Sequence, residues 1–210
     1  MSDLIMIRPH CRESEKTKRL SSILDFSLEG YTYDTISTVE EFRELKNNKI
    51  LFAISLGESG INLELYGLIK MIRLNRSCFE GCVGGIIIDG KSELFTKSVG
   101  RELAFSANLA GCTFPGKPLV EGTASLDNFD IVAKLLDVDP LEAYMHSGRV
   151  LAEHIMGFDP PKKKKPKILA LHASHYRKSN TLELWNLVKK HLDNCEITEI
   201  SLRNGTILDC

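Results

Sequence analysis

The stretch KILALHASHYRKSNTLELWNLVKKHL, residues 167–192, decides the fold because it gives a strand, a polar turn and an amphipathic helix in immediate succession. A parallel strand that ends in such a turn brings backbone N–H groups and the positive end of the next helix to one point, which suits a phosphate. We therefore expect a phosphate site in this turn, with side-chain donors from Ser174, Arg177, Ser179, Asn180 and Thr181.

This turn resembles the FMN-phosphate loop of the flavodoxin-like NAD(P)H-dependent FMN reductases and iron–sulfur flavoproteins, whose usual wording is close to I-S-G-S-P-R-K-N-G-N-T. The chain keeps Ser174, Asn180 and Thr181, and Arg177 stands where the family has a basic residue. The turn also departs from the pattern, which leaves its backbone less free to wrap a phosphate. The family prefers Gly, Pro and Gly where this chain has Ala173, His175 and Ser179.

The resemblance implies a flavoprotein oxidoreductase that binds FMN and accepts a hydride from NADH or NADPH. Because the flavin carries that chemistry, no catalytic side chain is implied. The alternative is a non-catalytic, flavodoxin-shaped domain that serves in assembly or regulation without bound flavin. Cys210 stands where the iron–sulfur flavoproteins begin a Cys-containing segment, but one cysteine alone cannot hold a cluster.

The last part of the chain is short for the domain that it resembles. Residues 167–210 hold a strand, a helix and a second strand at ITEISL, residues 197–202, whereas a doubly wound domain needs roughly 100 residues or more. We therefore expect residues 167–210 to be the truncated start of a flavodoxin-like FMN reductase domain, an incomplete second βαβ unit. Its unfinished sheet edge is expected to pair with another copy of the chain.

Residues 1–157 alternate strand and helix patterns, which predicts an α/β fold with a flavodoxin-like, doubly wound parallel sheet. Asp139 is expected to cap the last helix, with Pro140 in its first turn and Gly157 at its end. The expected strands are 3–9, 31–38, 49–57, 82–90 and 117–122, and the expected helices are 14–28, 39–47, 61–75, 92–111 and 139–157.

The first loop of this domain, RPHCRESEKT at residues 8–17, occupies the position of a phosphate loop but has no glycine. Glu13 and Glu15 would repel a phosphate dianion, so we expect this degenerate domain to have lost ordinary FMN binding. By resemblance, residues 49–60 and 86–97 hold the loops that would touch a flavin ring.

The segments 5–20 and 169–184 share the same order of features: a strand, a His, a basic residue, a Ser, a Thr and a helix. This similarity fits either a duplication or chance, since βα turns are generally polar.

Between the two parts, residues 158–166 are expected to form a linker. Prolines flank four consecutive lysines there, and the lysines repel one another into an extended, solvated strip. A localisation signal or a patch for an anionic partner is the functional alternative.

Composition narrows the classes of function. The net charge of −1 argues against general binding of nucleic acid or a membrane surface, and no apolar run approaches the roughly 18 residues of a membrane span. The six scattered cysteines favour reduced thiols, so the cytoplasm is the expected location.

Several other residues have a functional and a structural interpretation, and in each case we favour the structural one. The C-x3-C pair could ligate a metal, the histidines could ligate a metal or donate to an anion, and the acid and the aromatic turn could meet a flavin. These residues are Cys78 with Cys82, His146 with His154, His172 with His175, Glu58, and Phe114 with Pro115.

Overall fold

The computed structural model describes residues 2–11, 15–160, 165–173 and 179–202. The chain divides into two compact units, Met1–Pro160 and Pro161–Cys210, and each is described by itself. Of the predicted linker, residues 161–164 lie outside the described residues.

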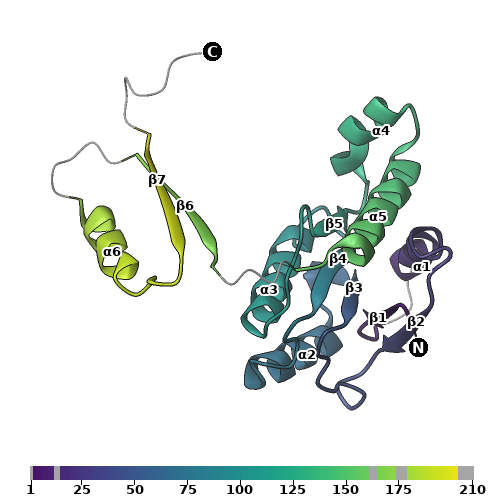
Figure 1. Cartoon of the computed structure of the whole chain (residues 1–210). Helices are drawn as coiled ribbons and strands as arrows, with labels where there is room; N and C mark the ends of the chain where they lie inside the picture. Colours follow the sequence, from purple (N-terminus) through teal and green to yellow (C-terminus); the bar gives the residue numbers. More distant parts are fainter. Residues whose placement is uncertain (1, 12–14, 161–164, 174–178, 203–210) are drawn as a thin grey trace. The chain divides into compact units, whose positions relative to one another are not determined.

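The first unit is built on a five-stranded sheet in which every pair of strands is parallel (Figure 1). The strand order is β2-β1-β3-β4-β5, which is the order of the flavodoxin-like doubly wound fold. The predicted fold class is therefore confirmed. The strands are β1 (Leu4–Ile7), β2 (Tyr33–Ile36), β3 (Lys49–Leu56), β4 (Val83–Gly90) and β5 (Leu119–Gly122).

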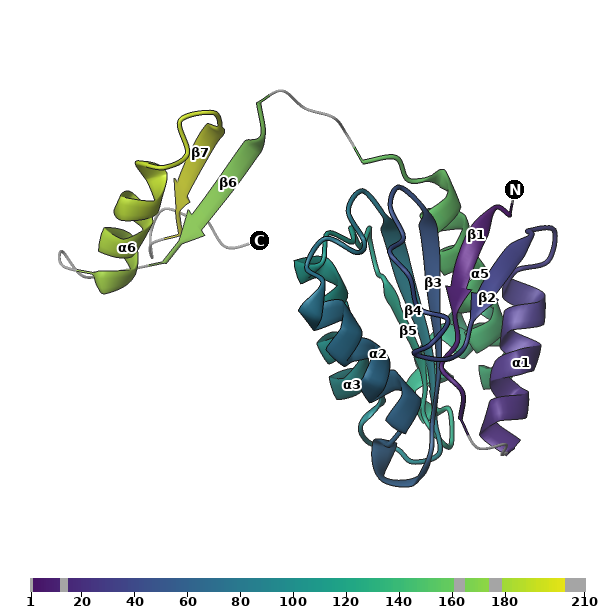
Figure 2. The same ribbon diagram turned by 90° about the horizontal axis from the view of Figure 1, so that it is seen from below.

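Helices cover both faces of this sheet, as Figure 2 shows. α1 (Glu15–Ser27) and α5 (Pro140–Gly157) pack on one face, and α2 (Leu63–Leu74) and α3 (Thr96–Leu109) pack on the other. A short helix, α4 (Asp130–Leu136), follows a 3₁₀ turn at Asp127–Phe129 and packs against α5. Two apolar cores result, one on each side of the sheet.

The central strands read as continuous apolar runs because both of their faces are covered. All eight residues of β4 are buried, and so are seven of the eight in β3. Close packing explains the small residues: a Cβ at Gly85 would lie 2.7 Å from Leu151 and Ile155 of α5, and one at Gly148 would collide with Ser27 of α1. A side chain of any size therefore does not fit at Gly85 on β4 or at Gly148 on α5.

Two helix predictions differ from the structure. Residues 39–47 form a turn followed by irregular chain, because their backbone donors have partners outside a helix: Leu45 N–H donates to Cys78 O at 2.7 Å and Asn47 N–H to Glu80 O at 3.0 Å. The acidic start that suggested a helix has another use, since the Glu41 carboxylate accepts from Ser37 N at 2.7 Å. The second difference is α4, which the sequence analysis did not predict.

The second unit contains one βαβ motif, β6 (Lys167–His172), α6 (Asn180–Lys189) and β7 (Glu196–Ser201), with the two strands parallel and adjacent. Alternate residues of β6 are half-buried and exposed. Leu169 and Leu171 are 60% and 56% exposed, and their partner-strand neighbour Ile200 is 44% exposed. One face of this small sheet is thus apolar and uncovered among the described residues.

None of the helices in the described ranges is long and apolar enough to cross a membrane.

Candidate functional site

The carboxyl ends of β1, β3, β4 and β5 meet at one edge of the five-stranded sheet, where α/β proteins place their ligands. The loops that follow β3 and β4 there are Gly57–Asn62 and Lys91–Phe95, and both lie within the described residues. The loop after β1 is described only to Cys11 and again from Glu15.

Asn62 fixes the loop after β3. Its side-chain Oδ1 accepts from Leu65 N at 2.9 Å and so caps α2, while its Nδ2 donates to Ser55 O at 2.9 Å at the end of β3. Glu58, at the exposed tip, reaches across to Lys91 of the next loop at 2.9 Å. The hydrogen bond from Lys91, together with its charge, lowers the pKa of Glu58. Glu58 is therefore a solvated, ion-paired carboxylate, as the structural interpretation predicts.

The loops after β3 and β4 press against each other at Gly60 and Phe95. A Cβ on Gly60 would collide with the Phe95 side chain, and both residues have positive φ, 72° and 77°. Positive φ is unusual for a bulky residue and costs energy that the surrounding contacts must offset. Phe95 remains 46% exposed and its neighbour Leu94 66% exposed, so this edge presents apolar surface.

Beneath these loops lies a buried ion pair between Arg19 of α1 and Asp89 of β4. The guanidinium donates to both carboxylate oxygens at 2.8 Å, and it also donates to Thr123 O at 2.7 Å and Ala124 O at 3.1 Å. Asp89 is fully buried and the Arg19 side chain is 14% exposed. This bidentate pair holds α1 to the carboxyl ends of β4 and β5.

Two arginines near the first loop, Arg8 and Arg19, interact with other residues of the same chain. Arg8, which directly follows β1, donates to Ser21 Oγ of α1 at 2.7 Å. Glu13 lies outside the described residues, and Glu15 is the first residue of α1. The guanidinium groups of Arg8 and Arg19 are thus engaged within the protein.

In the second unit, the residues predicted to bind phosphate lie in the segment between β6 and α6 and in the first turn of α6. Ser179 is the N-cap of α6, and its side chain accepts from Leu182 N at 3.4 Å. Asn180 and Thr181 are exposed in the first turn of α6. The two remaining predicted residues, Ser174 and Arg177, lie outside the described residues, as does His175.

His172 ends β6 on the side of the sheet that faces α6. Its Nε2 lies 3.4 Å from Glu199 Oε1 on β7, while Lys189 and Trp185 of α6 donate to Glu199 Oε2 at 2.8 Å and 3.0 Å. These hydrogen bonds lower the pKa of Glu199, with Lys189 the largest cause. His172 Nδ1 is buried and has no hydrogen-bond partner within the described ranges. The cluster ties α6 to both strands.

The other candidates have structural surroundings. Cys78, Cys82 and Cys112 are buried free thiols in the core beneath α2 and α3, and no group of metal-ligating side chains occurs among the described residues. Phe114 packs against Phe52 and precedes β5, at the opposite end of the sheet from the ligand edge. The functional interpretation, in which Phe114 and Pro115 meet a flavin at that edge, is therefore wrong, and the favoured structural interpretation holds. His146 meets Phe26 edge-on, and His154 lies near Gly116.

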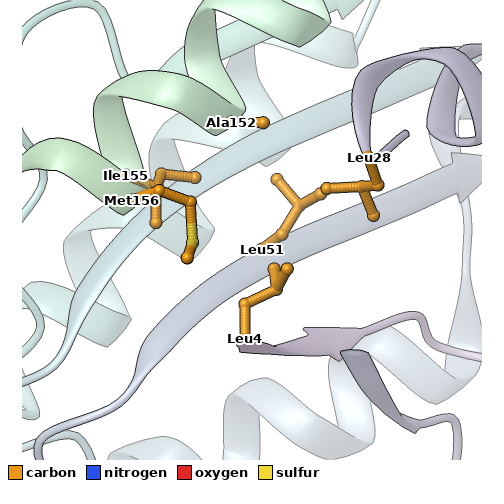
Figure 3. Close-up of a pocket in the computed structure, with 6 residues that line it drawn as sticks. All are labelled: Leu4, Leu28, Leu51, Ala152, Ile155 and Met156. Atoms are coloured by element: carbon orange, nitrogen blue, oxygen red, sulfur yellow. The ribbon is translucent and has the colours of Figure 1, made fainter. Parts of the chain in front are cut away.

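A small apolar crevice lies elsewhere in the first unit, between β1, β3 and α5 (Figure 3). It has no space for a water molecule and lacks polar lining side chains, so it is a packing defect rather than a ligand site. Its lining residues are Leu4, Leu28, Leu51, Ala152, Ile155 and Met156.

Sequence reasoning missed the Arg19–Asp89 pair. The available signal was Asp89 itself, a carboxylate that ends the apolar run VGGIIID. A charge in a strand covered on both faces needs a buried partner, but the sequence does not show which of the chain's basic residues supplies it.

No protein-family model matches the chain, and a search of curated proteins finds no significant match. Among solved structures, a flavodoxin of Streptococcus pneumoniae TIGR4 is 11% identical with a TM-score of 0.47, covering 70% of this chain and 95% of its own. A flavodoxin from the domain Archaea is 16% identical with a TM-score of 0.46, covering 72% of this chain and 99% of its own. The fold assignment rests on the strand order described above.

Proposed function

We propose that this chain belongs to a flavoprotein oxidoreductase of the NAD(P)H-dependent FMN reductase type, in which the turn at 174–181 binds the FMN phosphate. The carrying observation is that α6 begins at Asn180, shortly after β6 ends at His172, with Asn180 and Thr181 exposed in its first turn. Backbone N–H groups and the helix dipole at such a position favour an anion.

The donor set suits a phosphate. Ser179 already caps the helix through its side-chain oxygen, so its contribution is to fix the start of α6. Asn180 and Thr181 supply an amide and a hydroxyl that can donate to phosphate oxygens. When bound, FMN would supply the hydride chemistry, and the chain's own residues would bind and orient its phosphate.

One residue in the same turn opposes binding. Glu183 lies exposed in the first turn of α6, where its carboxylate favours the helix but repels a second anion. Glu183→Gln should therefore bind FMN more tightly than the wild type, by about threefold at low salt, in line with the modest energies of exposed charges.

The decisive experiment is an FMN titration of the full chain, monitored by quenching of flavin fluorescence. Asn180→Ala and Thr181→Ala should each weaken binding by about tenfold or more, since hydrogen bonds to a charged group contribute about 1.5–3 kcal/mol. Thr198→Ala, an exposed position on the outer face of β7, is the matched control and should bind as the wild type does. Riboflavin, which lacks the phosphate, should bind weakly to all four proteins.

The same titration distinguishes the second candidate function, a flavodoxin-shaped assembly or regulatory domain without flavin. The observation that favours it is the first unit's ligand edge, where Arg8 and Arg19 are engaged by Ser21 and Asp89. At about 1 mM FMN, only very weak binding escapes detection. If the wild-type protein binds no flavin at this concentration, the result supports this alternative and rules out the oxidoreductase proposal.

Three further features belong to this proposal. The hydride donor would be NADH or NADPH, and the protein would act in the cytoplasm. Pairing of copies would occur through an outer edge of the β6–β7 sheet, whose two strands pair only with each other among the described residues.

A further inference from the structure

The outer surface of α2 and α3 carries exposed apolar side chains. Figures 1 and 2 show these two helices side by side over one face of the sheet. Leu74 of α2 is 72% exposed, and Phe105 and Leu109, one helical turn apart on α3, are 62% and 53% exposed. Exposed apolar side chains gathered on one surface are typical of an interaction site.

The charges on this surface are mainly positive. Three acids pair with groups on or beside this surface: Glu64 accepts from Val39 N at 2.6 Å, Glu102 pairs with Arg73 at 3.1 Å, and Glu121 pairs with Lys97 at 3.7 Å. Arg73 and Lys97 are therefore partly neutralised, and the basic residues still outnumber the acids. We call the surface the basic face, and its exposed basic residues are Lys70, Arg73, Arg76, Lys97 and Arg101.

A second exposed apolar surface lies on the opposite side of the sheet, over α4 and the start of α5. Ala133 and Phe129 anchor this segment in the core that α1 and α5 share. Ile131 and Leu135, again one turn apart, are 74% and 79% exposed, and Leu136 is 50% exposed.

The charges on this second surface have the opposite sign. Over residues 127–142 the only basic residue is Lys134. We call the surface the acidic face, and its exposed acids are Asp127, Asp130, Asp137, Asp139 and Glu142.

We propose that the basic face of one copy docks on the acidic face of another. Each face offers an apolar pair at i, i+4, Phe105 with Leu109 and Ile131 with Leu135, surrounded by charges that are complementary between the faces. A two-fold dimer through either face alone would place like charges together, which opposes association.

The geometry of the contact follows from where the faces lie. Because they are on opposite sides of the sheet, the contact is heterologous, so each bound copy leaves a free basic face at one end and a free acidic face at the other. Association then continues beyond a dimer, to a ring or a linear chain. An anionic membrane would suit the basic face alone and would give the acidic face no partner.

The test uses two variants of the full chain, each with one face disabled. Leu74→Ser with Phe105→Ser alters the basic face, and Ile131→Ser with Leu135→Ser alters the acidic face; all four side chains are exposed, so both variants should fold. Sedimentation equilibrium of the wild type, up to about 0.5 mM, should show species larger than a dimer, and 0.5 M salt should weaken association by about tenfold or more.

Mixing the variants gives the distinguishing result. Each variant alone should form nothing larger than the dimer that pairing through the β6–β7 edge allows. An equimolar mixture should regain larger, salt-sensitive species, because the intact acidic face of one variant can dock on the intact basic face of the other. A wild type that forms nothing larger than a dimer, species larger than a dimer that persist in both variants, or binding of the wild type only to vesicles containing phosphatidylserine would each overturn the proposal. Circular dichroism of the variants, unchanged from the wild type, excludes misfolding as the cause.

Discussion

At the scale of single residues, we expect the Arg19–Asp89 pair to contribute most to the free energy of unfolding. Arg19→Met removes the guanidinium from a fully buried carboxylate, and we expect the free energy of unfolding to fall by about 3 kcal/mol, the cost of breaking a buried pair on one side. Urea denaturation followed by far-ultraviolet circular dichroism measures this loss.

The control for this prediction is the exposed pair between Glu58 and Lys91. Lys91→Met should leave the urea midpoint unchanged, because water screens both charges. Equal urea midpoints for Arg19→Met and Lys91→Met would show that the buried Arg19–Asp89 pair stabilises the fold no more than the exposed pair does.

The buried thiols give a prediction about reactivity and pH. Burial raises the pKa of Cys78 to about 11, and it also raises the pKa values of Cys82 and Cys112. The thiolate is the reactive form, so at pH 8 only about 0.1% of Cys78 can react, and its rate should rise about tenfold per pH unit until the pH approaches the pKa.

Alkylation with iodoacetamide, mapped by mass spectrometry, tests this rate. The half-exposed Cys11 and Cys195 should be modified first at pH 8, and urea should make all cysteines react alike. Rapid labelling of Cys78 in the folded protein at pH 8 would contradict the assignment of these thiols to the core.

At the scale of elements, the first turn of α5 can be tested through its cap. Asp139 accepts from Glu142 N at 2.9 Å, so Asp139→Ala should lower the free energy of unfolding by about 1 kcal/mol, while Asp139→Asn should change it little because asparagine caps equally well. Thermal denaturation of both variants measures the difference. A stable Asp139→Ala protein would show that the packing of α5 on α1 makes the cap redundant.

The same elements show how far the sequence predicts the fold. Buried strands such as β3 and β4 are predictable because an apolar run between helices has few alternatives, and the cap and stop of α5 were visible as Asp139 and Gly157. Residues 39–47 were predicted as a helix because the segment opens with acids, which the helix dipole favours. Their hydrogen bonds to Cys78 and Glu80 are long-range, and a local pattern cannot reveal such partners.

The candidate site was predictable to a similar extent. Ser179 was predicted as a phosphate donor and not as the N-cap of α6, although a Ser directly before an amphipathic helix is a local signal for a cap. Arg19 and Asp89 lie 70 residues apart, so their pairing depends on the fold. Features set by neighbouring residues in the sequence, such as the start of α6, can be predicted. Pairs of residues that the fold brings together from different elements cannot.

At the scale of the whole molecule, the two units differ in how much apolar surface they bury. Both central strands of the first unit are almost wholly buried, whereas no residue is fully buried in the described ranges 165–173 and 179–202. A unit that buries little apolar area has little to offset its chain entropy. The second unit should therefore unfold at lower urea concentration than the first.

The single tryptophan allows the two units to be followed separately, because Trp185 lies on α6 of the second unit. Tryptophan fluorescence should report an early urea transition, while far-ultraviolet circular dichroism should continue to change until the first unit unfolds. If the turn before α6 binds FMN, a concentration of 100 times Kd should stabilise only the early transition, by about 2.7 kcal/mol. Riboflavin at the same absorbance corrects for quenching by free flavin. Coincident transitions would mean that the two units unfold together, and a shift confined to the late transition would move the flavin site to the edge where Phe95 and Leu94 are exposed.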